Sequence, residues 1–288
     1  MRFNQRRKNF RAILNSDRCV HPGSVHDPMA ARIAQEVGFE VGIFAGSVAS
    51  MTVLGAPDLI VLTLSEFADQ ARRIGRASDL PLLVDADHGY GNALNVRRTV
   101  EELEIVGVAA LSIEDTDLPT PYGADGKASL ISLDEGIGKM KAALDARIDP
   151  DLVIAGRTSA AAIAGIDEAV RRAKAYEDVG VDALFMVGLK SREDLETVAA
   201  AVNTPIILGS ATKDMMNLDY LGPLGVRVCL QGHKVFAAAI EAIYRTQTAL
   251  HNGVAPGDLE DIASADLMNR LMRNEDYADW TKAFLEDD

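Results

Sequence analysis

Short hydrophobic runs alternate with longer amphipathic stretches along most of the chain. Each run is bounded by Gly, Pro or polar residues, a pattern typical of parallel strands that are covered on both faces. These runs predict eight strands, at about residues 19–25, 41–44, 81–84, 110–113, 153–155, 183–186, 205–208 and 226–230. Apolar residues at helical spacing predict helices at about residues 4–15, 28–37, 64–76, 93–106, 132–147, 166–179, 191–200 and 234–252.

The junctions between helices and strands repeat one motif. A helix ends at a glycine, which supplies a left-handed cap, and the next strand follows within a few residues. Glycines of this kind are Gly38, Gly107, Gly180 and Gly225. Eight strands alternating with helices favour a (β/α)₈ barrel of the TIM type over a doubly wound open sheet, although alternation alone is compatible with both.

The chain contains no Pro/Ser/Gly-rich linker, so one catalytic domain is expected over residues 1–252. The pattern breaks at residues 254–257, and the remainder of the tail, residues 253–288, reads as polar helical turns. Trp280 and Phe284 in this tail need a surface that covers them. The tail is therefore expected to pack on the barrel or on a second subunit.

Charge and composition narrow the function. The net charge of -14 over 288 residues argues against a nucleic-acid or anionic-membrane surface. No apolar span is long enough to cross a bilayer. The two cysteines, Cys19 and Cys229, give no disulfide framework and fit a reducing cytoplasm. A soluble cytoplasmic protein is expected.

Basic residues gather near the start of the chain, and no apolar segment typical of a signal peptide follows them. So short a run predicts an exposed helix face rather than a targeting signal. The residues are Arg2, Arg6, Arg7, Lys8 and Arg11.

Two acidic residues follow the predicted strand at residues 81–84. Because side chains alternate along an extended chain, Asp85 and Asp87 point the same way. Two like charges held together need a cation or a shared proton, and oxygen ligands favour a hard ion such as Mg²⁺. The alternative is that the acids belong to a turn that caps the next helix.

Other polar groups stand at the ends of further strands: Gly46-Ser47, Glu114-Asp115, Arg157 and His233. In a barrel the carboxyl ends of the strands meet at one mouth, where such folds place their chemistry. Together these residues are suited to a divalent ion and an anionic substrate. Arg157 would pair with a carboxylate in a bidentate fork, and Gly46 and Ser47 would hold the same anion.

Each residue also has a purely structural interpretation. Arg157 could be a buried ion-pair partner of Glu114, Ser47 a helix cap and His233 a cap of the last helix. The glycines at 89 and 91 could be turn residues. They do not form a dinucleotide fingerprint, because the third glycine and the helix-opening context are missing.

These motifs, over nearly the whole chain, resemble those of the isocitrate lyase/phosphoenolpyruvate mutase superfamily. Residues 92–96, after the acidic motif, are similar to the bacterial oxaloacetate decarboxylases of that superfamily. The segments that carry the resemblance are Ser24–Arg32, Gly46–Ser47, Asp85–Gly91, Ser112–Asp115, Ala155–Thr158 and Gly232–His233.

The resemblance implies a barrel in which Asp85 holds Mg²⁺ directly, while Asp87 and Glu114 hold it largely through water. Mn²⁺ is the alternative metal. It also implies substrates of the 2-oxo dicarboxylate class, and homotetramers whose C-terminal helices are exchanged between subunits. In this interpretation Gly46, Ser47, Asp85, Arg157 and His233 bind substrate, and Arg157 and His233 are the catalytic residues.

Several positions depart from the superfamily pattern. Members that cleave carbon–carbon bonds of isocitrate-like substrates carry a Cys in a Lys-Lys-Cys-Gly-His run of the loop after the fourth strand, whereas residues 116–127 contain no cysteine. His88 replaces a common Thr, Ser159 follows Arg-Thr where an acid or amide is usual, and residues 209–212 lack the Tyr expected of a decarboxylase. These changes affect the substrate and leave the metal and anion sites intact.

The sequence therefore predicts Mg²⁺-dependent decarboxylation of oxaloacetate, or of a close 3-carboxylated 2-oxo acid, to pyruvate and CO₂. Loss of CO₂ leaves an enolate, whose charge a chelated cation stabilises. The alternatives are a lyase of the methylisocitrate or dimethylmalate type and a phosphonomutase. A barrel that binds a dicarboxylate without catalysis is the alternative outside enzymes.

Overall fold

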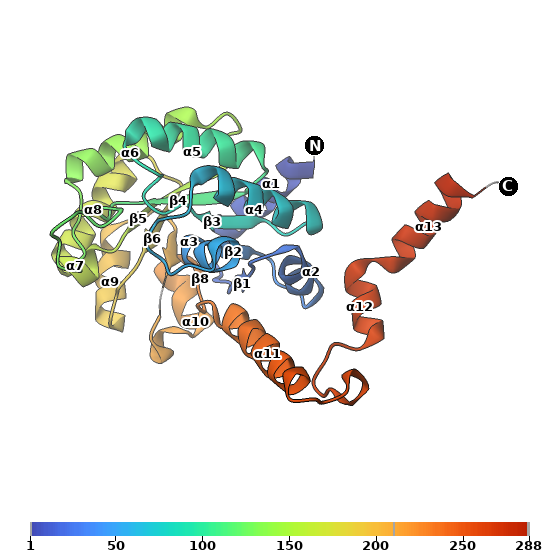
Figure 1. Ribbon diagram of the computed structural model, residues 1–288. Coiled ribbons are helices and arrows are strands. Elements are labelled where there is room, and N and C mark those ends of the chain that lie inside the picture. Colours follow the sequence, from blue (N-terminus) through green and yellow to red (C-terminus); the bar gives the residue numbers. More distant parts are fainter. Residues whose placement is uncertain (1, 210, 287–288) are drawn as a thin grey trace. The chain divides into compact units, whose positions relative to one another are not determined.

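The structure is a computed structural model that describes residues 2–209 and 211–286 (Figure 1). By its internal contacts the chain divides into two compact units, Met1–Lys234 and Val235–Asp288. No helix among the described residues is both long enough and apolar enough to cross a membrane.

The first unit is built on a sheet of eight parallel strands that follow one another in chain order. Their bounds are β1 Gly23–Ser24, β2 Gly42–Ala45, β3 Leu82–Asp85, β4 Ala110–Glu114, β5 Val153–Thr158, β6 Ala183–Met186, β7 Ile206–Leu208 and β8 Val226–Cys229. A parallel bridge between Val20 and Val228 joins the two ends of this order. The Cys229 N–H donates to the Val20 carbonyl at 2.9 Å. The sheet thus closes as the predicted (β/α)₈ barrel.

Helices surround the strands (Figure 1). The longer ones match the predicted ranges: α1 Arg2–Leu14, α2 Pro28–Glu36, α4 Leu64–Ala77, α5 Ala93–Ile105, α6 Leu133–Ala146, α8 Ile166–Val179 and α9 Arg192–Ala201. Short helices that the sequence does not predict are α3 Gly46–Ala49, η1 Ser50–Leu54, α7 Ala160–Ile163, η2 Lys213–Met215, α10 Leu218–Leu221 and η3 Gly222–Leu224. A single turn is too short to show helical periodicity.

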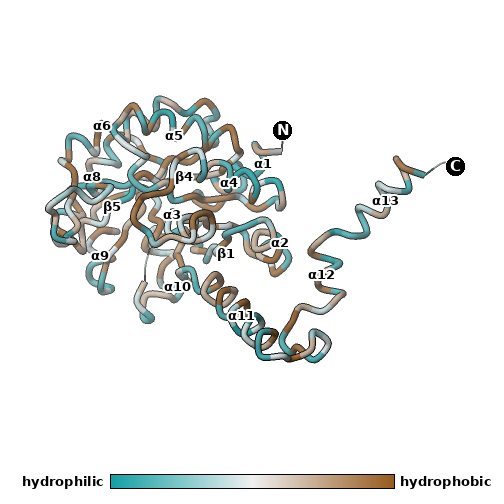
Figure 2. The backbone as a smooth tube through the Cα atoms, in the orientation of Figure 1, coloured by the Kyte–Doolittle hydropathy of each residue, from teal (hydrophilic) through white to brown (hydrophobic). Residues whose placement is uncertain are grey.

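Alternation along the strands gives the barrel two apolar layers. Side chains such as Phe44, Leu111 and Tyr176 pack between the strands and the outer helices. Side chains such as Leu83 and Val153 point inward and fill the barrel. Hydrophobic colour accordingly follows much of the sheet in Figure 2. Because the interior is filled, a ligand of the barrel has room at the ends of the strands rather than between them.

Helix α1 closes the amino-terminal end of the barrel. Its apolar residue Phe10 joins the inward-facing cluster. Arg6 donates to the carbonyl of Gly75, and Arg7 donates to the carbonyls of Glu104 and Val108 and to Asp149. Arg6 and Arg7 are 3% and 5% exposed. The prediction of an exposed basic face is therefore wrong for these two residues, because their guanidinium groups bond to carbonyl groups at helix ends and loops.

We expect Arg7→Ala to lower the free energy of unfolding by about 3–5 kcal/mol, since the change leaves a largely buried carboxylate and two carbonyls without their donor. The Arg7 Nη1 atom lies 2.6 Å from Asp149 Oδ2, and the two side chains are 6% and 16% exposed. Urea unfolding measures the effect, with Lys8→Ala, an exposed neighbour on the same helix, as the control. Equal unfolding midpoints for the two variants would contradict this role.

The second unit contains α11 Lys234–His251, η4 Pro256–Asp258, α12 Ala265–Met272 and α13 Asn274–Leu285; Lys234 itself closes the first unit. The sequence analysis assigns the helix at 234–252 to the barrel domain, whereas the boundary drawn from contacts follows Lys234. The expected domain boundary after residue 252 stays a prediction. Within one chain Trp280 is 43% and Phe284 77% exposed. Tyr277 meets Trp280 edge-on, with ring centroids 5.0 Å apart.

Candidate functional site

A cavity of about 250 Å³ opens at the carboxyl ends of the strands. Most of the predicted site residues line it: Ser47, Asp85, Asp87, Glu114, Arg157 and His233. These residues come from segments far apart in the sequence, and the parallel barrel brings them together because every strand ends at the same mouth. These six residues thus lie together at the mouth, while the roles assigned to them stay predictions.

Arg157 is the centre of the charged network. Its Nη1 atom lies 2.5 Å from Asp85 Oδ2 and 3.4 Å from Glu114 Oε1. Burial alone lowers the pKa of Arg157, but the charges of Asp85 and Glu114 outweigh it and the pKa is raised. The guanidinium therefore stays charged. It also forms the buried ion pair with Glu114 that the sequence analysis gives as an alternative role. Its Nε is buried without a hydrogen-bond partner among the described residues.

Two hydroxyl groups fix the carboxylates around Arg157. Ser112 Oγ donates to Asp85 Oδ1 at 2.9 Å, and Thr116 Oγ1 donates to Glu114 Oε2 at 2.5 Å. Each carboxylate oxygen has a second lone pair, so Asp85 can still bind a further partner. The side chains are thus held in place before any ligand arrives.

The backbone conformation of Asp87 and the small space beside Gly46 fix the position of the Asp87 carboxylate. Its φ of 48° is left-handed, and its carbonyl accepts the Glu114 N–H at 2.8 Å. A Cβ at Gly46 would come within 2.3 Å of an Asp87 carboxylate oxygen. Gly46 is therefore required for the position of Asp87, although it does not itself line the cavity.

The capping alternative for the acidic turn is wrong. Helix α5 takes its N-cap from Asn92, whose side chain accepts the Leu94 N–H at 2.9 Å. Neither Asp85 nor Asp87 caps that helix. Likewise Ser47 lies within α3, whose N-cap is Ala45. The acids and Ser47 are left facing the cavity.

The donors at the mouth suit a divalent cation. Burial, then the charges of Asp85 and Glu114, raise the pKa of Asp87 well above its usual range, and burial also raises the pKa of Glu114. The Asp87 carboxylate accepts no hydrogen bond from the described residues. Buried, crowded carboxylates of this kind fit a hard cation, which compensates their charge.

Within the described part of the chain, no three acidic, His or Cys side chains converge closely enough to ligate one metal ion directly. The described side chains, as they lie, therefore do not form a site in which all three acids are direct ligands. Mg²⁺ usually keeps several waters in proteins.

Three of the singled-out residues do not face the cavity. Asp115 is fully buried and bonds to Arg172 at 3.0 Å and to the Tyr176 hydroxyl at 2.7 Å. His88 is buried, and burial together with nearby Lys139 lowers its pKa to about 4. Ser159 precedes α7 and makes no capping bond. In residues 209–212, which differ from the superfamily pattern, Gly209 lines the cavity and Ser210 lies outside the described residues.

Asp58 is the residue that the sequence analysis misses. It lies in the loop after η1, lines the cavity, and has a pKa raised by burial and by the charge of Asp85. The search for polar residues at strand ends cannot find Asp58, because it lies 13 positions beyond the end of β2. Its neighbour Pro57 marks a loop but gives no sign of a site.

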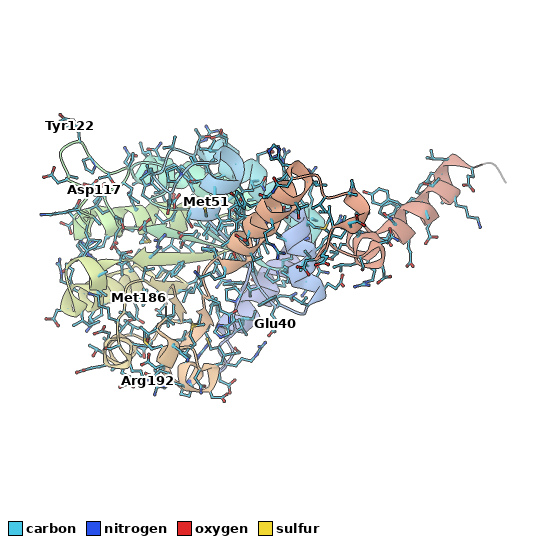
Figure 3. The ribbon with its side chains drawn as sticks, turned by 60° about the horizontal axis from the view of Figure 1, so that its bottom comes forward. Glu40, Met51, Asp117, Tyr122, Met186 and Arg192 are labelled. Atoms are coloured by element: carbon cyan, nitrogen blue, oxygen red, sulfur yellow. The ribbon has the colours of Figure 1, made fainter. Side chains whose placement is uncertain are left out.

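The loop after β4 forms part of the cavity wall. Its base is a short antiparallel pairing of Thr116 with Leu130. Leu118 and Thr120 line the cavity, whereas Tyr122 lies at the outward tip of the loop (Figure 3). The loop contains no thiol. Both cysteines are buried on the barrel, and burial raises the pKa of Cys19 to about 12 and that of Cys229 to about 11.

The closed parallel sheet with a charged cavity at its carboxyl end defines a (β/α)₈ barrel protein with an enzyme-like site. The chain belongs to the phosphoenolpyruvate phosphomutase family, whose profile matches residues 10–251. It is similar to an oxaloacetate decarboxylase of Bradyrhizobium sp. (strain ORS 278), with 54% identity over 285 residues and 99% of each chain covered.

A second relative is the oxaloacetate decarboxylase of Bradyrhizobium diazoefficiens, with 57% identity over 273 residues, covering 95% of this chain and 94% of the relative. Among solved structures, a phosphonopyruvate hydrolase in complex with oxalate and Mg²⁺ superposes with a TM-score of 0.87. That pair has 27% identity, with 98% and 99% of the two chains covered.

Proposed function

We propose that the protein catalyses the Mg²⁺-dependent decarboxylation of oxaloacetate, or of a close 3-carboxylated 2-oxo acid, to pyruvate and CO₂. The observation that carries this proposal is the identity of 54% and 57%, over almost the full chain, to relatives named oxaloacetate decarboxylase. The charged cavity supports it, since it combines a carboxylate cluster with one buried arginine.

Asp85 would hold the cation directly, and Asp87 and Glu114 would hold it through water. Mn²⁺ is the alternative ion. When bound, the cation supplies Lewis-acid stabilisation of negative charge on the substrate oxygens. The protein contributes the fixed carboxylates: Ser112 and Thr116 orient two of them, and Gly46 leaves space for the third.

Arg157, which lines the cavity, would bind the substrate carboxylate or the 2-oxo oxygen, and the Gly46–Ser47 segment would orient the same end. The bond between C3 and C4 then breaks, CO₂ leaves, and the electron pair remains on the substrate as an enolate. A proton added to C3 from solvent completes pyruvate. His233, on the cavity wall, would contact the departing carboxylate or assist that protonation.

Apolar side chains also line the cavity. Phe185, Val187 and Leu230 come from or follow the strands β6 and β8. The loop residues Leu118 and Thr120 would limit the access of water to the enolate.

The lyase alternative needs an acid that protonates the leaving carbanion, and the loop offers no thiol for this step. We therefore expect Cys19→Ser and Cys229→Ser to retain most of the oxaloacetate activity. Pyruvate release from oxaloacetate is measured beside glyoxylate release from 2-methylisocitrate. Faster glyoxylate release, or loss of activity in either folded cysteine variant, contradicts the decarboxylase proposal and favours a lyase. A phosphonomutase would instead rearrange phosphoenolpyruvate, which a ³¹P NMR assay detects.

The second unit is proposed to pack on a neighbouring copy of the chain. Its exposed apolar residues include Ile243, Tyr244, Trp280 and Phe284. Side chains of this size are usually covered in an assembly. We propose a cytoplasmic homotetramer with exchanged C-terminal helices, for which light scattering should give the mass of four chains.

A further inference from the structure

Ser24, in the first strand of the barrel, contacts His233, which follows the last strand. It lies in β1, and its Oγ is 2.8 Å from Nδ1 of His233, which follows β8. Ser24 is only 7% exposed and does not line the cavity. Val20, shortly before β1, is bridged to Val228 of β8, so the contact between Ser24 and His233 lies at the junction that closes the barrel.

The direction of the hydrogen bond follows from the partners of Ser24. A hydroxyl has one hydrogen to donate, and a buried donor without an acceptor is costly. Among the described residues the Ser24 side chain has one hydrogen-bond partner, His233 Nδ1. If Nδ1 carried the proton, the hydroxyl hydrogen would have no acceptor among the described residues. The hydroxyl therefore donates, and Nδ1 accepts.

This arrangement requires neutral His233 with its proton on Nε2. Burial lowers the pKa of His233, which favours the neutral ring. The ring faces a cavity wall that also contains Asp58 and Asp85, whose charges act in the opposite direction. A neutral ring whose Nδ1 is occupied can offer the cavity only an N–H donor.

We propose that Ser24 is a positioning residue that fixes His233 in the Nε2–H tautomer, so that the imidazole donates a hydrogen bond to an oxygen of the bound 2-oxo acid. The inference rests on the proposed function, because it assigns His233 as a donor to that substrate. It adds that His233 does not act as a general base from the resting state, since the nitrogen with a free lone pair is held by Ser24.

The test combines a spectroscopic readout with kinetics. The chain has five histidines, so ¹⁵N-histidine labelling and long-range ¹H–¹⁵N spectra resolve the tautomers, and the His233→Gln variant identifies the His233 signals. At pH 7.5 we expect protonated Nε2 and bare Nδ1 in the wild type. Ser24→Ala should mix the two tautomers and lower kcat about tenfold, the effect of one neutral hydrogen bond. Ser24→Thr, which keeps the hydroxyl, should restore both.

Ser78→Ala is the matched control, because Ser78 is also buried but follows α4 at the other end of the barrel. It should change neither readout. A protonated Nδ1 in the wild type overturns the proposal, as does an unchanged tautomer in folded Ser24→Ala. If His233→Gln keeps full decarboxylase activity while the tautomers behave as expected, the role of His233 in the proposed function fails instead and Ser24 loses its catalytic relevance.

Discussion

Asp85→Asn is expected to weaken Mg²⁺ binding by more than about 100-fold and to reduce pyruvate formation to the background rate. The change keeps the size of the side chain and an acceptor for Ser112, but it removes the charge of the proposed direct ligand. A lost ligand should cost more than a lost outer-shell partner, whose removal typically costs about 10–100-fold. The Asp87→Ala and Glu114→Ala variants should therefore bind Mg²⁺ more tightly than Asp85→Asn does.

Titration calorimetry measures these affinities without any substrate. Asp69→Asn is a suitable control, because Asp69 pairs with Arg72 and Arg73 on the surface of α4. Its affinity should equal that of the wild type. An Asp85→Asn protein that binds Mg²⁺ normally would show that the ion is held elsewhere.

Arg157→Ala is expected to lower kcat/KM for oxaloacetate by about 10²–10³-fold, the effect of losing one preorganised donor to developing negative charge. Mg²⁺ affinity should not fall, because the change removes a positive charge that lies 2.5 Å from Asp85 and 3.4 Å from Glu114. Arg157→Lys should restore little activity, since an ammonium group lacks the planar fork of a guanidinium.

Comparing kcat/KM with Mg²⁺ affinity separates two roles of Arg157: contact with the substrate and neutralisation of the carboxylates. If Arg157 served only to neutralise the carboxylates, its removal would change metal affinity or stability and leave turnover of the loaded enzyme nearly intact. Arg98→Ala, at an exposed pair with Glu102, controls for general effects of losing an arginine. Retention of wild-type kcat/KM in a folded Arg157→Ala protein would refute the proposed substrate contact.

The barrel and most of the mouth are predictable from the sequence for a simple physical reason. Buried parallel strands are uniformly apolar, so a polar residue at the end of such a run, such as Asp85 or Arg157, stands out. Parallel strands then bring all these ends to one edge. The prediction needs only the local pattern and the topology.

What escapes prediction depends on contacts between distant segments. Asp58 reaches the cavity from a loop whose path no periodic pattern reveals. In the sequence, Arg6 and Arg7 look like part of an exposed basic helix face. They are buried in the structure because they bond to carbonyl groups of residues about 70 to 100 positions away. Glu114 and Asp115 are neighbours, yet one faces the cavity and the other bonds to Arg172, because side chains alternate along the strand.

The most direct test of the central claim is the rate of pyruvate formation from oxaloacetate by the purified protein, compared with Mg²⁺ alone and with the protein after chelation of metal. We predict equal amounts of pyruvate and CO₂ at a rate far above the metal background, lost on chelation and restored by added Mg²⁺. A rate no higher than that of free Mg²⁺, from a folded protein that binds oxaloacetate, would contradict the proposed function and leave a dicarboxylate-binding barrel.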